Sequence, residues 1–378
     1  MRRSPQPHSG GPNHRIMFRM KQLFSVCLLL ALAACAAPPA TLSPTAAAPT
    51  VIASVPTLVA TPLPPPSAVA EPTPTNKLFV ISVPLDAPTL APVVATTTTL
   101  TTTLTYPPNF MAEFDGAQAL AHAQTLAPFV PRNPGTPGWQ QTGDYIIAQM
   151  RAAGWEVEEQ RFTYNNVACR NIIAKRGTGP LLLVGAHYDG RTFSDQDPDP
   201  ARRNDPMPGA NDGLSGVAAL LELGRVVQPE AFGRTVWLTF FDAEDNGGIN
   251  GWDWIAGSRH VAQTLTITPT AMVLLDMMGD ADLSLYYESN SDPYVRQTIW
   301  AAAQHLGFPQ FIAQEKHSML DDHTPFLERG IPAVDIIDFD YPYWHTTADT
   351  VDKLSAESLN AVGDTMELWL ESGGVTAQ

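Results

Sequence analysis

Five short blocks in the later part of this chain combine carboxylates and imidazoles in a fixed order. They are His187-Tyr188-Asp189, Gly209-Ala210-Asn211-Asp212, Asp242-Ala243-Glu244-Asp245, Leu275-Asp276 and Trp344-His345-Thr346. Each block supplies one or two oxygen or nitrogen ligands of the kind that Zn²⁺ binds. The first four follow, or lie just beyond, an apolar run typical of a strand. Because ligands collect at the carboxyl ends of strands in an open α/β sheet, we expect the blocks to meet at one or two metal ions.

Each block is weak evidence by itself, because each has a structural alternative. The imidazole of His187 could bind zinc with Asp189 orienting it from behind, but an isolated His-x-Asp is more often a surface turn. Asp212 lies between Gly209 and Gly213, which allow tight backbone geometry beside a bound group, but it could also cap the following helix. Only the five blocks in this order favour a metal site.

The adjacent acids Glu244 and Asp245 give the sharpest signal. They follow the apolar run 236–241, where solvated surface is not expected. One acid can bind metal while the other, unligated, works as a general base, and a charged loop is the alternative. Asp276 ends another buried run, so its carboxylate needs a metal or a second acid as partner.

Most of the 35 prolines of this 378-residue chain lie in its first third. The composition therefore places the folded part of the chain after that segment. We expect one domain over residues 109–378. A formal net charge of -16 disfavours nucleic acid as a partner, because phosphate backbones attract Lys and Arg. Only one of the three cysteines, Cys169, lies in the expected domain. It therefore has no disulfide partner there, and a buried side chain is favoured over a nucleophile.

Residues 1–35 have the pattern of a targeting sequence. Basic residues precede the apolar run 23–34, which is long enough for a signal peptide and short for a membrane span. The run ends at Leu32-Ala33-Ala34-Cys35, which resembles the lipobox of bacterial lipoproteins. That resemblance implies an exported cell-envelope protein, anchored to a membrane through a lipidated Cys35. An ordinary signal peptide cut near Ala34 is the alternative.

Residues 36–108 consist mainly of Pro, Thr, Ala and Ser, as in Pro62-Leu63-Pro64-Pro65-Pro66. Such a segment buries too little apolar surface to offset the entropy of ordering it. We expect a semi-extended tether between the membrane and the folded domain.

Hydrophobic spacing in the expected domain predicts alternating strands and helices. Strands are expected at 155–162, 171–174, 181–186, 235–241, 271–275 and 333–337. Helices are expected at 112–127, 139–153, 215–227, 293–305 and 356–370. This alternation predicts a mostly parallel sheet that is covered on both faces.

The five blocks together resemble those of the M28 zinc metallopeptidases and their relatives, the glutaminyl-peptide cyclotransferases. The resemblance covers about residues 131–370 and implies an α/β fold, a three-layer α/β/α sandwich around a mixed, mostly parallel sheet. In the peptidase pattern Asp212 bridges two zinc ions and Glu244 activates the attacking water. The remaining ligands that this pattern implies are His187 and Asp276 for one ion, and Asp245 and His345 for the other.

Further motifs resemble the cyclotransferase branch. They are Arg132-Asn133-Pro134-Gly135-Thr136-Pro137-Gly138, Gly257-Ser258-Arg259-His260, Asp321-Asp322-His323-Thr324-Pro325-Phe326-Leu327 and Trp344-His345-Thr346. In that branch Glu244 passes a proton from the substrate α-amine to the departing ammonia. The branch also implies one zinc held by Asp212, Asp245 and His345, a hydrogen-bonded acid pair of Asp276 and Asp321, and a pocket wall at Trp344.

Three positions depart from these patterns. Asp245 stands where both groups usually carry Glu, the block from Asp212 to Gly216 follows the peptidase form, and Asp335 stands where the animal cyclotransferases carry His. We therefore expect a zinc enzyme acting on peptide or protein N-termini. A glutaminyl-peptide cyclotransferase is the first hypothesis, a secreted aminopeptidase with two zinc ions the second, and an inactive cell-surface binding domain the third.

Overall fold

The computed structural model describes residues 106–107 and 109–374. The expected signal sequence with Cys35, and nearly all of the expected tether, lie outside these residues and stay predictions. Within the described part of the chain, none of the helices has the length and apolarity needed to cross a membrane.

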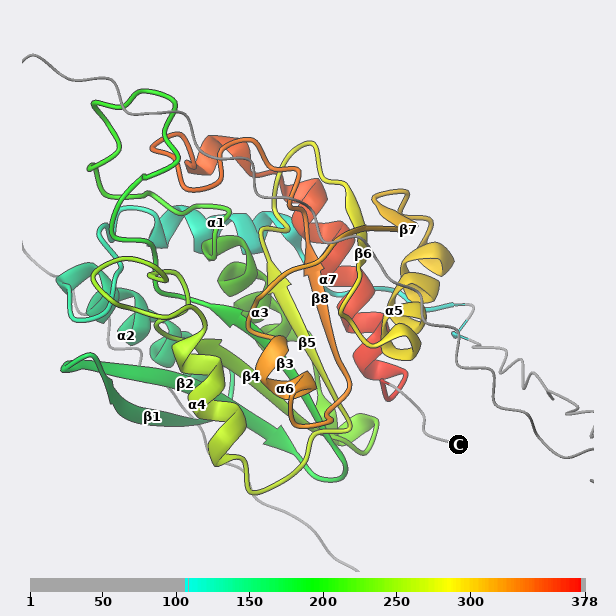
Figure 1. Ribbon diagram of the computed structural model, residues 1–378. Helices are drawn as coiled ribbons and strands as arrows, with labels where there is room; N and C mark the ends of the chain where they lie inside the picture. Colours follow the sequence, from blue (N-terminus) through cyan, green and yellow to red (C-terminus); the bar gives the residue numbers. More distant parts are fainter. Residues whose placement is uncertain (1–105, 108, 375–378) are drawn as a thin grey trace, which may run out of the picture. The chain divides into compact units, whose positions relative to one another are not determined.

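Six strands form the central sheet, in the order β1-β2-β4-β3-β5-β8 (Figure 1). Their bounds are β1 (Glu156–Tyr164), β2 (Val167–Gly177), β3 (Leu181–His187), β4 (Thr235–Phe241), β5 (Ala271–Asp276) and β8 (Ala333–Ile337). Strands β4, β3, β5 and β8 run parallel, whereas β1 with β2 and β2 with β4 are antiparallel pairs. The sheet is therefore mixed and mostly parallel, as expected, although β2 is longer than the predicted strand 171–174.

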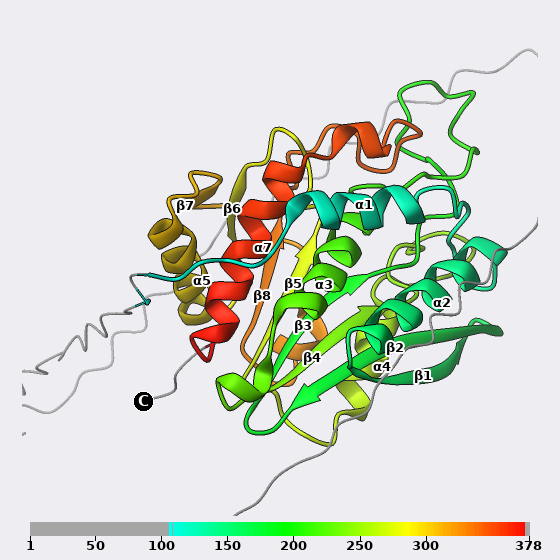
Figure 2. The same ribbon diagram turned by 180° about the vertical axis from the view of Figure 1, so that it is seen from behind.

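Helices cover both faces of this sheet (Figures 1 and 2). They are α1 (Gly116–Leu126), α2 (Pro137–Ala152), α3 (Leu214–Val226), α4 (Ala256–Thr264), α5 (Pro293–Leu306), α6 (Thr324–Leu327) and α7 (Ala356–Glu371), with short 3-10 turns at Pro229–Ala231 and Val351–Lys353. Figure 1 shows α4 and α6 in front of the sheet and α1, α3 and α7 behind it. The molecule is the predicted three-layer α/β/α sandwich.

Strand β3 shows how both faces become core. Leu182 and Val184 belong to the apolar cluster on the side of α3, whereas Leu181 and Leu183 belong to the smaller cluster on the other side. Successive side chains of a strand point to opposite faces, so a continuous apolar run is needed where both faces are covered.

A second sheet pairs β6 (Leu285–Glu288) with β7 (Phe311–His317) in parallel, and the sequence analysis missed both strands. Their pattern is weak, because β6 has four residues and β7 is largely exposed with a run of polar side chains. The sheet packs on α5 through Trp300, whose ring lies 5.1 Å from Phe311 and 5.0 Å from Tyr287.

Helix α3 lies close against the sheet at the end where the predicted ligands gather. A Cβ atom on Gly216 would lie 2.2 Å from the carbonyl oxygen of Leu275, so only glycine allows this approach. The close packing fixes the start of α3, and with it the Asp212 loop, against the end of β5.

Candidate metal centre and active site

The parallel strands bring the predicted ligands to one edge of the sheet. His187 is the last residue of β3, and Asp276 is the last residue of β5. The Glu244-Asp245 pair follows β4, and Asp212 lies two residues before α3. His345, from the loop that follows β8, joins them. Four connections that are distant in sequence therefore converge, as expected at the carboxyl ends of parallel strands.

One cluster consists of His187, Asp212 and Asp276, all of which are buried. The Nε2 atom of His187 lies 3.0 Å from Oδ1 of Asp212 and 3.3 Å from Oδ1 of Asp276. A Cβ atom on Gly213 would lie 2.4 Å from the same Nε2 atom. Glycine at position 213 is therefore required for the imidazole to reach both carboxylates.

A second cluster consists of Asp212, Asp245 and His345, and it shares Asp212 with the first. The Nε2 atom of His345 lies 3.0 Å from Oδ1 of Asp245 and 3.5 Å from Oδ2 of Asp212. Asp212 thus offers one carboxylate oxygen to each imidazole. The structure brings together all five predicted ligands, in two sets of three with one member in common.

The chemistry of these groups fits metal binding. Several of their buried atoms have no hydrogen-bond partner: both ring nitrogens of His187, Nδ1 of His345, Oδ2 of Asp212, Oδ2 of Asp245 and Oδ1 of Asp276. Buried polar atoms without partners are costly, and a cation between them would satisfy the oxygen and nitrogen ligands. Burial, followed by the neighbouring charge of Asp212, raises the pKa of Asp245 to about 6. Imidazole and carboxylate donors in sets of three suit Zn²⁺ with an open position for substrate.

Three left-handed backbone conformations at non-glycine residues accompany the site. Ala243, Met277 and His345 have φ values of 57°, 42° and 55°. Ala243 immediately precedes Glu244, and Met277 follows Asp276. Such conformations persist where the surrounding structure holds them, and they cluster at functional sites.

Asp189 supports the loop that carries Glu244 and Asp245, whereas the sequence analysis expected it to orient the imidazole of His187. Its carboxylate accepts hydrogen bonds from the backbone N–H groups of Glu244, at 3.0 Å, and Asp245, at 3.4 Å. Its Oδ1 atom also lies 3.8 Å from Nδ1 of His187. One carboxylate thus orients the loop after β4 and faces the imidazole at the end of β3.

Asp349 is a supporting residue that sequence reasoning missed. Its carboxylate accepts hydrogen bonds from the backbone N–H groups of Asn211, at 2.8 Å, and Asp212, at 3.2 Å, and from the hydroxyl of Tyr341, at 2.7 Å. The same loop is held from the other side by Arg132, which donates to the carbonyl oxygens of residues 208 and 209. Only the position of Asp349, four residues after His345, could have drawn attention to it.

Arg191 is the second missed residue, and it supports the Asp245 side of the centre. Its guanidinium donates to the backbone oxygen of Asp245, at 2.9 Å, and to the carboxylate of Asp195, at 2.6 and 2.8 Å. It also lies over the ring of Trp254, 4.9 Å from the ring centroid. The loop after β3 thereby fixes the backbone that carries the shorter acid.

A pocket of about 200 Å³ opens onto the second cluster. It is lined by Asp212, Glu244, Asp245, Trp254, Asp276, Met277, Met319, Leu320, Asp321, Ile337, Phe339, Trp344 and His345. His187 is not among these residues. The ring of Trp344 stacks on His345, with 3.7 Å between ring centroids, and Trp254 is stacked on the same imidazole at 6.0 Å. The pocket therefore has metal ligands at one end and apolar walls around them.

Two acids that belong to neither cluster face this pocket, Glu244 and Asp321. Burial raises the pKa of Glu244 well above its usual range, and nearby carboxylates such as Asp245 raise it further. Burial also raises the pKa of Asp321, with Asp335 as the strongest charged neighbour. Among the described residues, neither carboxylate oxygen of Asp335 has a hydrogen-bond partner, and the expected pairing of Asp321 with Asp276 stays a prediction.

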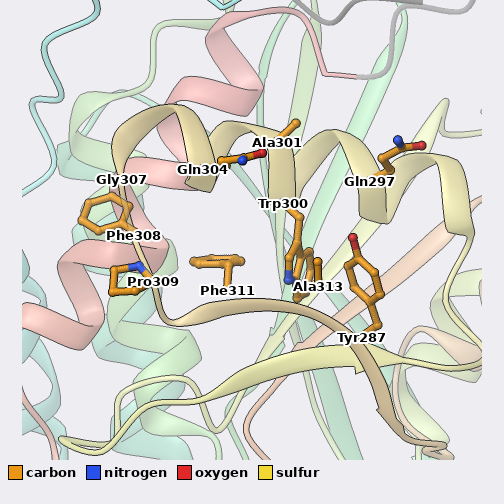
Figure 3. Close-up of a pocket in the computed structure, with 10 residues that line it drawn as sticks. All are labelled: Tyr287, Gln297, Trp300, Ala301, Gln304, Gly307, Phe308, Pro309, Phe311 and Ala313. Carbon is orange, nitrogen blue, oxygen red and sulfur yellow. The ribbon is translucent and has the colours of Figure 1, made fainter. Parts of the chain in front are cut away.

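A second pocket, of about 480 Å³, lies between α5 and the β6–β7 sheet (Figure 3). Figure 3 shows Trp300, Tyr287 and Phe311 facing one another beneath the helix. Its lining contains aromatic, apolar and amide side chains but no carboxylate or imidazole. The groups that could bind metal or transfer protons therefore belong to the smaller pocket.

Cys169 is a buried free cysteine, and burial raises the pKa of its thiol. A thiol held in its neutral form is a poor nucleophile, which agrees with the expected structural role.

Comparison with known proteins identifies the class. Residues 171–370 match peptidase family M28. The crystal structure of Porphyromonas gingivalis glutaminyl cyclase is similar with a TM-score of 0.65 and 32% identity, over 69% of this chain and 99% of that one. A Zn-dependent exopeptidase from Parabacteroides distasonis ATCC 8503 is similar with a TM-score of 0.65 and 31% identity, over 69% and 99%.

Among curated proteins, a glutaminyl-peptide cyclotransferase-like protein of Bos taurus is 26% identical over 283 residues, which are 64% of this chain and 72% of the relative. This chain belongs to peptidase family M28. Its relatives include both glutaminyl cyclases and an exopeptidase.

Proposed function

We propose that this protein is a zinc-dependent glutaminyl-peptide cyclotransferase, which converts an N-terminal glutamine into pyroglutamate with release of ammonia. The observation that carries the proposal is the small pocket in which Glu244 and Asp321, neither of them in a ligand cluster, face the metal-binding groups. The glutaminyl cyclases among the similar structures support it.

Asp212, Asp245 and His345 would hold the zinc, because these three form the cluster that faces the pocket. The bound ion supplies Lewis-acid polarisation of the γ-carbonyl of the substrate glutamine. Trp344 lies against His345 at the mouth of this cluster and, together with Phe339, forms an apolar wall. These walls exclude water and hold the glutamine side chain folded toward its own amine.

The reaction forms a bond between the α-nitrogen and the γ-carbon, and it breaks the bond from the γ-carbon to the amide nitrogen. Glu244 accepts the proton that the α-nitrogen loses and returns it to the amide nitrogen, which leaves as ammonia. A raised pKa, which the burial of Glu244 produces, suits a group that must both accept and release a proton near neutral pH. Nucleophile and carbonyl belong to one substrate molecule, so fixing their geometry gives a large intramolecular advantage.

Asp321 faces the same pocket and is protonated more readily than an ordinary aspartate, first because of burial and then because of Asp335. A neutral carboxyl can donate a hydrogen bond as well as accept one. In the proposed reaction Asp321 donates to the substrate amide and accepts from the departing ammonia.

A second candidate function is that of an aminopeptidase, and the cluster of His187, Asp212 and Asp276 favours it. This cluster provides a complete second set of three buried ligands, as a two-zinc hydrolase requires. Glu244 would then take its proton from water instead of from the substrate amine.

We also propose that the protein is exported and held at the cell envelope by a lipidated Cys35. The sequence pattern around residue 35 supports this. A Cys35→Ser variant should be released from the membrane fraction, and a variant that stays there as firmly as the natural protein would contradict the anchor.

Mass spectrometry of two peptides, one beginning with Gln and one with Leu, tests the enzymatic proposal. Incubation with the purified, zinc-loaded protein should remove ammonia from the Gln peptide and leave the Leu peptide intact. Stepwise shortening of the Leu peptide would establish the aminopeptidase instead. If neither peptide changes and the protein purifies without zinc, the third hypothesis, a binding domain, is favoured.

A further inference from the structure

Two motifs of the sequence, residues 132–138 and 257–260, have no part in the proposed reaction, yet both lead to Asp242. This residue is fully buried directly after β4, and it lies two residues before Glu244, which transfers the proton in that reaction. Asp242 does not line the pocket and belongs to neither ligand cluster. Any effect of its carboxylate on the reaction therefore passes through the backbone that leads to Glu244.

The carboxylate of Asp242 accepts hydrogen bonds from three parts of the chain. Its Oδ1 atom accepts from the indole N–H of Trp139, at 2.9 Å, and from the backbone N–H of Ala243, at 2.8 Å. Its Oδ2 atom accepts from the backbone N–H of Arg170 on β2, at 2.7 Å. Ala243 has a left-handed φ of 57°, which a residue other than glycine keeps only where its surroundings hold it. The carboxylate thus closes the turn that leads from β4 to Glu244.

The motif at 132–138 fixes the direction of the Trp139 indole, which lies in the first turn of α2. The hydroxyl of Thr136 accepts from the backbone N–H of Trp139, at 3.3 Å, and donates to the carbonyl oxygen of Pro131, at 2.7 Å. A Cβ atom on Gly138 would lie 2.4 Å from that same carbonyl oxygen, so glycine is needed for this close approach. The guanidinium of Arg170 covers the ring, 5.1 Å from its centroid. The indole is therefore held at its backbone and over its face.

The motif at 257–260 holds the same turn on its backbone side. A Cβ atom on Gly257 would lie 1.9 Å from the carbonyl oxygen of Asp242, so only glycine allows α4 to lie this close. The side chain of Asn171 accepts from the backbone N–H of Asp242, at 3.0 Å, and donates to the carbonyl oxygen of Gly257, at 3.0 Å. The carbonyl oxygen of Glu244 in turn accepts from the N–H of Ile255, at 3.1 Å. The two motifs therefore hold the turn from opposite sides.

We propose that Asp242 is a positioning residue, and that the hydrogen bond from the Trp139 indole fixes its carboxylate so that the turn at Ala243 directs Glu244 into the pocket. In this orientation Glu244 lines the pocket, with Oε2 3.9 Å from Nδ1 of His187. The inference rests on the proposed function for the task of Glu244, which transfers the proton under both candidate functions. The geometry that it describes does not depend on the substrate.

The test uses two variants of the zinc-loaded protein, with Gln-peptide cyclisation as the assay. Trp139→Phe keeps an aromatic ring but removes the indole N–H, and Asp242→Asn leaves one acceptor oxygen for three N–H donors. Each should lower kcat by about 10- to 100-fold, because a misplacement of about 1 Å is enough to cost about 100-fold, while KM and zinc content stay near those of the natural protein. Trp155→Phe is the matched control and should keep the natural kcat. Its buried indole donates to the carbonyl oxygen of Gly224, at 2.7 Å, and it lines neither of the two pockets.

The Glu244→Gln background separates a positioning role from a merely structural one. In that background Trp139→Phe should cause no further loss of the residual activity, because both changes act through one carboxyl. A general defect of the fold would instead lower the residual activity by the same factor as it lowers the natural one. Losses that multiply in the double variant, or a Trp139→Phe enzyme with kcat within about twofold of the natural value, would overturn the proposal.

A crystal structure of Trp139→Phe separates failure of this inference from failure of the proposed function. The turn at Ala243 and the Glu244 side chain should be displaced whatever the substrate is, and an unchanged Glu244 would overturn the positioning role even if Gln peptides are cyclised. If the protein shortens the Leu peptide instead, the same variants are assayed on that reaction, because Glu244 transfers the proton there too. If Trp139→Phe does not fold, Asp242→Asn takes its place in the double variant and in the crystal structure.

Discussion

The two ligand clusters share Asp212 but differ in what they face. His345 and Asp245 line the pocket, and the ring of His345 is covered by Trp344. His187 does not line the pocket, and its ring lies beneath the backbone of Gly213. A substrate can therefore reach an ion in the cluster of His345, whereas the cluster of His187 is closed off on the imidazole side.

This difference separates the two candidate functions. Cyclisation needs one ion facing the pocket, because the substrate carries its own nucleophile. Hydrolysis by two ions needs the buried cluster to be filled as well. Asp276 lines the pocket and also belongs to the buried cluster. It is therefore the one residue of the buried cluster, apart from the shared Asp212, that a substrate in the pocket would contact. Variants that act on one cluster at a time therefore show which chemistry the site performs.

The largest expected effect comes from Glu244→Gln, which changes neither cluster. Gln keeps the size of the side chain but cannot accept and return a proton, so kcat should fall by about 100- to 10,000-fold. The zinc content should not change, because Glu244 belongs to neither set of ligands. Kinetics and metal analysis of the same preparation check both statements. Glu328→Gln, at an exposed residue paired with Arg259, is the control, and full activity in Glu244→Gln would falsify the mechanism for both candidate functions.

The next effect compares the two imidazoles directly. His345→Gln should lower zinc affinity and activity by at least about 100-fold, since even the supporting partners of ligands are worth 10- to 100-fold. His187→Gln should leave zinc in the pocket-facing cluster and keep kcat within about tenfold if the protein is a cyclotransferase. Zinc titration and kinetics of the pair measure the difference. Equal loss of activity in both variants, with the zinc content falling from two ions to one in His187→Gln, would establish the aminopeptidase instead.

Removing zinc should make the stability of the fold depend on pH. Burial raises the pKa of Asp349 and Asp322 to about 7, and that of Asp245 to about 6. These carboxyls bind protons more tightly in the folded chain than in the unfolded chain, where the pKa is about 4. Their contribution to stability is therefore complete below about pH 4 and is lost as the pH rises to about 7.

Thermal unfolding in the presence of a chelator should accordingly show a midpoint that falls between pH 5 and pH 8. Zinc should flatten this dependence, because a bound cation stabilises the charged form of Asp245 and its neighbours. Glu288, whose pKa lies at about 2, stays charged throughout this range and does not contribute. Equal slopes with and without zinc would show that the buried carboxylates are not the ion's ligands.

The sequence predicted the parallel strands and the ligands at their ends because both leave strong local patterns. Leu181–Ala186 is continuously apolar, and His187 follows it at once. Residues that act through hydrogen bonds to the backbone leave no such pattern. Asp349 and Arg191 resemble ordinary charged loop residues until the fold brings them to the Asp212 and Asp245 loops. Strands β6 and β7 were missed for a similar reason, because their pairing depends on packing against α5.

The smallest expected effect concerns Asp245, where related enzymes usually carry Glu. The structure shows how the shorter acid is held: the backbone N–H of Asp245 donates to Asp189, its carbonyl accepts from Arg191, and its Oδ1 atom lies 3.0 Å from Nε2 of His345. The loop is thus fixed at a distance suited to Asp, and Glu would extend the side chain by about 1.5 Å.

Asp245→Glu should therefore weaken zinc binding by about two- to tenfold, with a similar loss of activity at limiting zinc. Competition with a fluorescent chelator measures the affinity, and Asp205→Glu, at an exposed position, serves as the control. Adding Arg191→Met should release the loop and recover part of the loss, since the two residues share a contact and their effects should not be additive. Tighter zinc binding in Asp245→Glu alone would mean that the loop adapts freely. The pocket-facing cluster would then be no more rigidly held than the buried one.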